Sequence, residues 1–153
     1  MRPDLERLGL WDEEWARRRF LETYVPVNTD IIEVGEKPVG VIAVRPEPDA
    51  LWIEHFYLDP AAQGRGLGRQ VLQYVMDAHR DGRPFRLAID RGSAARKLYE
   101  RVGFVHLYDD DNGVDQVFGA PGGVFAPHRS SCSSRNPQNC ESTRERWKKV
   151  SEV

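Results

Sequence analysis

The sequence is poor in cysteine and has no long apolar run. Only two of its 153 residues are cysteines, Cys132 and Cys140, and both lie in a polar segment near the C-terminus. Two cysteines form at most one disulfide and do not make a zinc site by themselves, so neither a disulfide framework nor a metal cofactor is predicted. No apolar run approaches the ~18–20 residues of a membrane-spanning helix, and the first residues lack the apolar stretch of a signal peptide. We therefore expect a cytoplasmic protein without membrane attachment.

Neither sign of charge dominates the chain. It has 22 basic and 24 acidic residues, a net charge of −2, which argues against nucleic-acid binding through overall charge. Residues 126–153 differ from the rest, because six basic and three acidic residues give them a net charge of +3 and Ser, Asn and Pro are frequent. We expect residues 1–125 to form one domain, residues 119–123 to act as a linker, and residues 126–153 to be a mobile basic tail. The one element expected in the tail is a short helix at 142–150.

Apolar periodicity and turn residues predict a single α/β domain. Helices are expected at residues 12–24, 66–79 and 93–102, with Ser93 and Gly103 as the caps of the last one. Strands are expected at 29–34, 39–44, 51–58, 85–89, 104–108 and 114–118, with turns at 36–38 and 111–113 closing two hairpins. This order of elements predicts a mixed sheet covered by helices.

The segment 51–58 is predicted to be a central strand, because both of its faces contain apolar residues. Strict alternation places Glu54 and Phe56 on one face and His55 and Tyr57 on the other.

A glycine-rich turn follows this strand and precedes a helix. Residues 63–69 read Gln-Gly-Arg-Gly-Leu-Gly-Arg, so free backbone N–H groups, the helix dipole and two arginines would surround an anion. A Walker loop is excluded because Arg69 follows Gly68, and a dinucleotide fingerprint is excluded because Arg69 stands where its last glycine belongs. The turn predicts a phosphate-bearing ligand, and a glycine-rich helix start without a ligand is the alternative.

Two segments resemble one enzyme family. Residues 63–68 (QGRGLG) resemble the Gln/Arg-x-x-Gly-x-Gly/Ala motif of the GNAT superfamily of acetyl-CoA-dependent N-acetyltransferases, and residues 94–104 (AARKLYERVGF) are similar to its A-x-x-L-Y-x-x-x-G-F segment. The resemblance covers roughly residues 11–118. It implies a mixed, mostly antiparallel sheet that splays into a V between strands 51–58 and 85–89. It also implies an N-acetyltransferase that moves an acetyl group from acetyl-CoA directly to a primary amine.

The resemblance also assigns roles to residues. The CoA pyrophosphate is expected on the glycine-rich turn, the pantetheine arm along the end of strand 51–58, and the proton for the leaving thiolate on Tyr99, for which core packing is the alternative. The expected cofactor-binding residues are Phe56, Tyr57, Leu58, Gln63, Gly64, Arg65, Gly66, Leu67, Gly68, Arg69, Ser93 and Arg96. Glu54 is the candidate general base, with a surface or ion-paired carboxylate as the alternative, and His55 is expected to be a structural histidine.

The sequence departs from the family pattern at two places. Gly92 stands where the family often has Asn, and the residues before the first helix leave almost no room for the family's first strand. These departures favour a second hypothesis, a catalytically weak acyl-CoA-binding sensor or interaction module. The acceptor, either a small molecule or a protein amine, has no motif, and a homodimer is compatible with the sequence.

Overall fold

The computed structural model describes residues 12–111, 113–122 and 148–149. It contains three α-helices within those residues, α2 (Glu13–Thr23), α3 (Leu67–Ala78) and α4 (Arg96–Val102), and two short 3₁₀ helices, η1 (Pro26–Asn28) and η2 (Pro60–Ala62). The strands are β1 (Thr29–Val34), β2 (Lys37–Pro46), β3 (Leu51–Leu58), β4 (Phe85–Asp90), β5 (Val105–Asp109), β6 (Asp115–Ala120) and β7 (Lys148–Lys149). The predicted order of helices and strands is therefore confirmed from residue 12 to residue 120.

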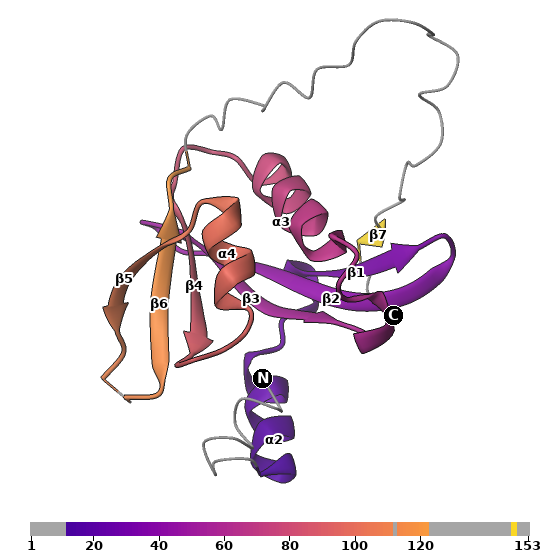
Figure 1. Cartoon of the computed structure of the whole chain (residues 1–153), viewed down its shortest axis with the longest axis horizontal. Helices are drawn as coiled ribbons and strands as arrows, with labels where there is room; N and C mark the ends of the chain where they lie inside the picture. Colours follow the sequence, from indigo (N-terminus) through magenta and orange to yellow (C-terminus); the bar gives the residue numbers. More distant parts are fainter. Residues whose placement is uncertain (1–11, 112, 123–147, 150–153) are drawn as a thin grey trace, which may run out of the picture.

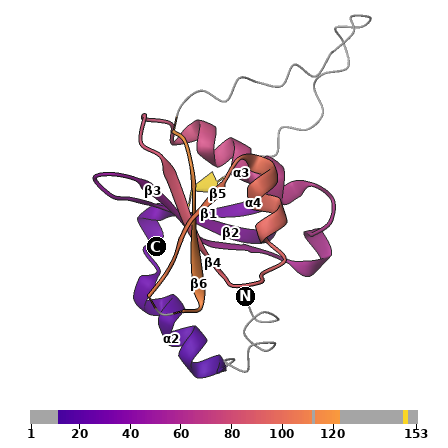
Figure 2. The same cartoon turned by 60° about the vertical axis from the view of Figure 1, so that its left-hand side comes forward.

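All described strands join one mixed sheet, in the order β5-β6-β4-β3-β2-β1-β7 (Figures 1 and 2). Only the β3–β4 pair is parallel, and the other neighbours are antiparallel. The prediction of a mixed, mostly antiparallel sheet is thus confirmed.

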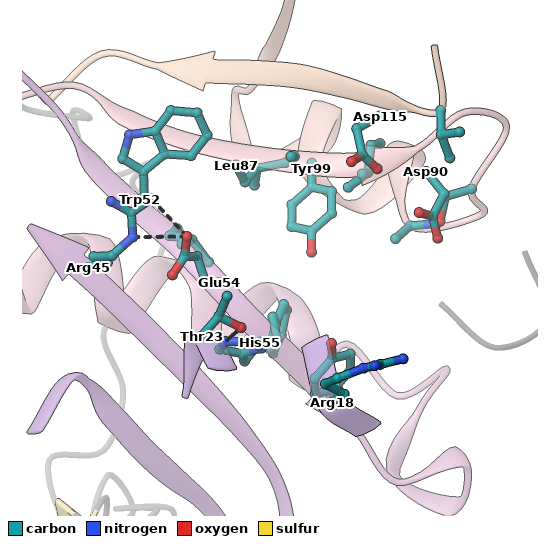
Figure 3. Close-up of a pocket in the computed structure, with 18 of the residues that line it drawn as sticks. Arg18, Thr23, Arg45, Trp52, Glu54, His55, Leu87, Asp90, Tyr99 and Asp115 are labelled. Carbon is teal, nitrogen blue, oxygen red and sulfur yellow. Dashed lines mark hydrogen bonds and ion pairs between the residues drawn. The ribbon is translucent and has the colours of Figure 1, made fainter. Parts of the chain in front are cut away.

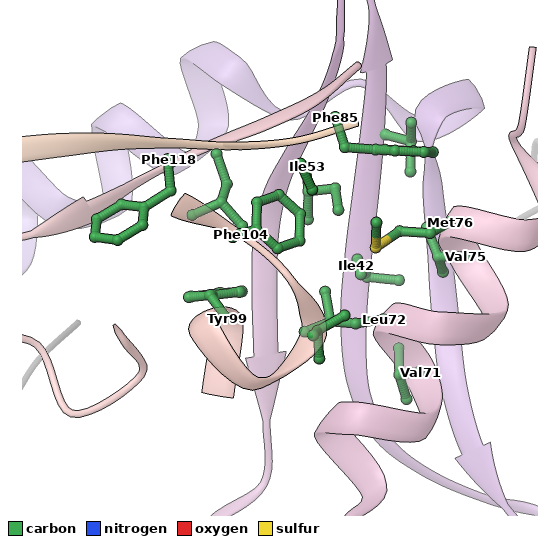
Figure 4. Packing of buried hydrophobic residues seen from close by; sticks show 14 of the residues in the cluster. Ile42, Ile53, Val71, Leu72, Val75, Met76, Phe85, Tyr99, Phe104 and Phe118 are labelled. Carbon is green, nitrogen blue, oxygen red and sulfur yellow. The ribbon is translucent and has the colours of Figure 1, made fainter. Parts of the chain in front are cut away.

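The apolar core lies between the sheet and helices α3 and α4. Helix α3 buries one face, formed by Leu67, Val71, Leu72, Val75 and Met76. This face packs on sheet residues such as Ile42, Ile53 and Phe85, and the core continues to Phe104 and Phe118 under α4 (Figure 4). Helix α2 contacts the opposite face of β3, because the Phe20 ring lies against His55 and Tyr57. No helix in the described ranges is long and apolar enough to cross a bilayer.

Two predicted boundaries shift. The β1–β2 turn is Gly35-Glu36, with Gly35 at φ +66°, because Lys37 and Pro38 already pair with β1. Helix α4 begins at Arg96 rather than at Ser93, because residues 93–95 form a turn. In that turn Ser93 Oγ accepts from the Ala95 N–H at 3.3 Å and does not cap the helix. Gly103 is confirmed as the C-terminal cap at φ +105°.

The predicted linker at 119–123 is wrong at its start. Gly119 and Ala120 belong to β6, where they pair with Arg86 and Phe85 of β4. A Cβ on Gly119 would lie 2.7 Å from Leu107 Cδ1, so this glycine admits a neighbouring side chain of β5 and does not mark a flexible joint.

The outer edge of β1 is covered in part by β7. Lys149 pairs with Asp30 and Lys148 with Ile31, antiparallel to β1. The helix expected at 142–150 is therefore wrong for these two residues, and the rest of the expected tail lies outside the described residues.

Candidate active site

Strands β3 and β4 separate soon after they meet. They pair only at Leu51–Phe85 and Trp52–Arg86, although β3 continues to Leu58 and β4 to Asp90. A cleft of about 740 Å³ opens between the diverging strands and is lined by residues 52–57 of β3 and 87–90 of β4. The V-shaped splay expected from the resemblance is therefore present, and the backbone of β3 beyond Trp52 is left without a ladder partner on that side.

A β-bulge interrupts β3 inside the cleft. Val41 and Ala43 of β2 pair with Tyr57 and Glu54 of β3, so β3 has one residue more than β2 over this stretch. The extra residue is accommodated at His55, which has φ +49°. A bulge of one residue exchanges the faces of the strand that follows.

The exchange of faces corrects the predicted alternation. Phe56 and Leu58 pack on the core together with Leu51 and Ile53, whereas Tyr57 faces Phe20 of α2. Glu54 and Phe56 therefore do not share a face, and His55 does not point away from the cleft. Glu54, His55 and Tyr57 all line the cleft.

The glycine-rich turn connects the end of β3 to α3. Gly64 and Gly66 have φ +77° and +80°, and a Cβ on either would meet no atom within 4 Å, so both glycines serve the left-handed backbone. Gln63 Nε2 donates to the Leu58 carbonyl oxygen at 2.8 Å, which fixes the turn to the strand. Gly66 caps α3 without a side-chain hydrogen bond, so the first N–H groups of the helix remain available for an anion.

The other glycine and the two arginines of the turn differ in role. A Cβ on Gly68 would lie 3.1 Å from Leu98 Cδ2 and 3.5 Å from Leu58 Cδ1, so Gly68 allows close packing of α3 on α4 and β3. The side chains of Arg65 and Arg69 are exposed, and neither forms an ion pair with another described residue. Their positive charge is available at the helix N-terminus.

The ring of Tyr99 packs in the core, and its hydroxyl lies at the cleft (Figure 3). Its ring is 7% exposed and lies edge-on to Phe104, with 5.9 Å between centroids. Its hydroxyl points into the cleft (Figure 3) and forms no hydrogen bond with a described residue. Burial, with a smaller contribution from the Tyr57 phenol, raises the pKa of Tyr99 well above its ordinary value, so the hydroxyl stays protonated.

Glu54 lies on the opposite wall of the cleft and is ion-paired. Its Oε1 accepts from Arg45 Nε at 3.0 Å and from Arg45 Nη2 at 2.9 Å. The guanidinium carbon of Arg45 is 5.8 Å from the centre of the Trp52 ring, and Glu47 binds the same guanidinium. Hydrogen bonding to Glu54 raises the pKa of Arg45, so the guanidinium stays charged. Of the alternatives for Glu54, the ion pair is the one observed, and it sits inside the cleft.

Of the remaining predicted cofactor-binding residues, Ser93 lies at the cleft and Arg96 does not. Ser93 lines the cleft together with Tyr99. Arg96 does not: its Nε donates to Glu100 Oε1 at 2.7 Å, and its guanidinium lies over the Phe118 ring at 5.5 Å. Within the described residues, no group of His, Cys, Asp and Glu side chains is arranged to hold a metal ion.

Two carboxylates at the cleft were not found from the sequence. Asp90 and Asp115 face each other across the β4–β6 pair, both line the cleft, and Asp115 is only 7% exposed. Single aspartates at a strand end and a strand start have no motif, and only the pairing of β4 with β6 brings them together beside Tyr99 (Figure 3).

Comparison with known proteins identifies the family. The family model of the acetyltransferase (GNAT) domain matches residues 23–106, which is more than half of the chain. No curated protein sequence matches. Many solved structures do, among them the ribosomal-protein-S18-alanine N-acetyltransferase from Escherichia coli (TM-score 0.55, 19% identity, 77% of this chain and 81% of that chain).

Two further similar structures are an acetyltransferase from Thermus thermophilus and the N-acetylglutamate synthase from Neisseria gonorrhoeae. The first has a TM-score of 0.57 and 22% identity over 69% of this chain and 71% of that chain. The second, complexed with coenzyme A and N-acetyl-glutamate, has a TM-score of 0.57 and 18% identity over 80% of this chain and 31% of that chain. These likenesses show the fold, and with the matching family model they show that the chain belongs to the GNAT acetyltransferase family and is an acyltransferase.

Proposed function

We propose that this protein is an N-acetyltransferase that moves an acetyl group from acetyl-CoA to a primary amine by direct transfer in a ternary complex. The observation that carries the proposal is the cleft between β3 and β4, which runs beside an unpaired length of β3 backbone. At the end of that strand the glycine-rich turn leads to the N-terminus of α3, which has no side-chain cap. A thioester on a long phosphate-bearing arm fits this combination, because one strand leads from the phosphate site to the reacting carbonyl.

In this proposal the turn binds the CoA pyrophosphate. Backbone N–H groups between Gly64 and Arg69 supply the hydrogen bonds, and the exposed Arg65 and Arg69 add positive charge. The pantetheine arm pairs with the backbone of Phe56, Tyr57 and Leu58. Ser93 on the opposite wall is a further contact, whereas Arg96 is engaged by Glu100 and Phe118 and is omitted from the proposed binding set.

The reaction needs one group that gives a proton and one that accepts a proton. The amine nitrogen attacks the thioester carbon, a C–N bond forms, and the C–S bond breaks. Backbone N–H groups of β3 stabilise the negative charge on the carbonyl oxygen. Tyr99 gives its proton to the leaving sulfur, a role supported by a protonated hydroxyl that points into the cleft. The amine loses a proton to the β3 wall, where Glu54 and His55 are the two side chains able to accept it.

The acceptor is proposed to be a primary amine of a small molecule or of a protein. Similar structures include enzymes of both kinds, since one is a ribosomal-protein-S18-alanine N-acetyltransferase and another is an N-acetylglutamate synthase. Glu54 favours an ammonium group near the reacting carbon, because its carboxylate lines the cleft. A cytoplasmic location and a homodimeric state remain predictions of the sequence.

Titration calorimetry with acetyl-CoA tests the proposal, with ATP and NAD as controls. We expect micromolar binding that is selective for acetyl-CoA. Turnover is then measured by release of free CoA thiol with glutamate, spermidine, an aminoglycoside and a peptide that begins with alanine. Absence of acetyl-CoA binding to a folded sample contradicts the proposal. Selective binding without turnover on any of these amines would favour the sensor or interaction module instead.

A further inference from the structure

His55 has a backbone conformation that side chains rarely adopt. It is the one non-glycine residue among those described with a positive φ, +49°, and it lies inside a strand. Such conformations persist where the surrounding structure enforces them and cluster at active sites. The bulge at His55 turns its imidazole away from the core and into the cleft, against the Phe20 ring of α2 at 4.8 Å between centroids.

Thr23 lies within hydrogen-bond distance of this imidazole. The Thr23 hydroxyl donates its hydrogen to the Phe20 carbonyl oxygen at 3.3 Å, and His55 Nε2 lies 3.1 Å from the same hydroxyl oxygen. A hydroxyl has one hydrogen; when that hydrogen is given to Phe20, Thr23 Oγ1 is left to accept from His55 Nε2–H. A neutral imidazole with hydrogen on Nε2 has its lone pair on Nδ1, and no described residue forms a hydrogen bond to that nitrogen.

We propose that His55, held as its Nε2–H form by Thr23, is the catalytic base that takes the proton from the acceptor amine through Nδ1. This inference rests on the proposed acetyl transfer. The proton balance is complete: the amine gives one proton to Nδ1 as the C–N bond forms, and Tyr99 gives one to the sulfur as the C–S bond breaks. His55 lies on β3 and Tyr99 on α4, on opposite walls of one cleft (Figure 3), so base and acid approach the reacting carbon from two sides.

The contacts favour His55 over Glu54 for this step. Oε1 of Glu54 already accepts two hydrogen bonds from Arg45, which leaves only Oε2 to meet an amine. Nδ1 of His55 has no such competitor among the described residues. Glu54 keeps a second role, because its negative charge attracts the acceptor as an ammonium, which releases one proton to solvent before the neutral amine attacks and gives its second proton to Nδ1.

Other charged groups surround His55 and act on the pH profile. The charged side chains that line the same cleft are Asp12, Arg18, Arg45, Glu54, Asp90 and Asp115. The phenols of Tyr57 and Tyr99 line it as well. A change of kcat/KM with pH is therefore assigned to His55 only if it disappears when the imidazole is removed.

The first test is His55→Asn, because Asn tolerates positive φ better than most residues and keeps the bulge. We expect acetyl-CoA affinity to be unchanged and kcat with the best amine of the panel to fall by ~10²–10⁴-fold. In the pH profile of kcat/KM, we expect the change caused by ionisation of the imidazole to disappear and the change caused by ionisation of the acceptor amine to stay. His79→Asn, which removes an exposed imidazole at the end of α3, leaves both parameters unchanged. Equal kcat and an equal pH profile in His55→Asn overturn the proposal.

The second test needs no acceptor. Long-range ¹H–¹⁵N spectra of the imidazoles, in the presence of acetyl-CoA, distinguish Nε2–H from Nδ1–H, and His55→Asn assigns the signal. We expect the Nε2–H form in the wild-type protein and in Thr23→Ser, and a mixture of forms in Thr23→Val. An Nδ1–H form in the wild-type protein overturns the proposal. A folded protein that binds no acetyl-CoA contradicts the proposed function, whereas binding and Tyr99-dependent turnover with an unchanged His55→Asn contradict this inference alone.

Discussion

Arg45 holds Glu54 through two hydrogen bonds to a single carboxylate oxygen, from Nε at 3.0 Å and from Nη2 at 2.9 Å. Both residues line the cleft. The arrangement fixes the position of a negative charge beside the place where an ammonium must arrive, and it occupies one of the two carboxylate oxygens that could accept a proton. A carboxylate in this state is suited to attraction more than to proton transfer.

Glu54→Gln separates these two roles. If Glu54 attracts the acceptor, the KM for the amine rises by up to about tenfold, consistent with the ~1 kcal/mol of a partly exposed ion pair, and kcat changes little. Steady-state kinetics with the best amine of the panel gives both parameters. Glu47→Gln is the matched control, since Glu47 binds the same guanidinium but does not line the cleft. A kcat that falls by two orders of magnitude in Glu54→Gln would make Glu54 the base.

Tyr99→Phe removes the proposed acid and keeps the ring that packs on Phe104. We expect kcat to fall by ~10²–10⁴-fold, with the acetyl-CoA dissociation constant and thermal midpoint little changed. Because burial raises the pKa of Tyr99 above its ordinary 10.0, the wild-type enzyme should lose no activity through ionisation of this phenol up to pH 10. Tyr108→Phe, at an exposed position of β5, is the control. Unchanged turnover in Tyr99→Phe would exclude it as the acid.

Gly66→Ala tests the anion-binding turn. Gly66 has φ +80°, and an alanine in this conformation costs ~1–2 kcal/mol, so the turn must either strain or move. We expect weaker acetyl-CoA binding in calorimetry and a lower free energy of unfolding. Gly35→Ala imposes a similar strain at φ +66° in the β1–β2 turn. It should lower stability by a similar amount and leave acetyl-CoA affinity unchanged; equal losses of affinity in both variants would contradict a local role for Gly66.

The sequence predicted those parts of the fold that depend on local patterns. The helix at residues 66–79 follows from its apolar stripe, and the β5–β6 hairpin follows from the turn at 111–113. The splay between β3 and β4 and the cleft beside Tyr99 followed from the family resemblance, and both are present.

The bulge at His55 could not be predicted in the same way. Residues 51–58 all suit a strand, so the sequence predicts that their side chains alternate between the two faces without interruption. The extra residue becomes visible only in the pairing of β3 with β2. The same holds for Asp115, whose place in the cleft depends on pairing between β4 and β6. A glycine-rich stretch is typical of loops and predicts a linker at Gly119, whereas the space that this glycine leaves is filled by Leu107. In each case a contact between distant segments decides the position.

The acid stability of the β5–β6 hairpin depends on Asp109. Hydrogen bonds from Gln116 and His106, with Arg91 nearby, lower the pKa of its carboxyl from 3.8 to about 2. A group whose pKa is lower in the folded protein stabilises it above the unfolded value and loses that stabilisation as the pH falls through the folded value. The contribution of Asp109 is therefore complete above about pH 4 and lost between pH 3.8 and about 2.

Asp109→Asn should be less stable than the wild-type protein at pH 7, and the two proteins should converge in thermal midpoint as the pH falls to about 2. Thermal unfolding followed by circular dichroism from pH 7 to pH 2 measures both. Asp111→Asn, in the turn and without an ion pair to a described side chain, should parallel the wild-type curve. A difference between Asp109→Asn and wild type that stays constant across this range would show that the carboxylate charge at residue 109 does not stabilise the hairpin.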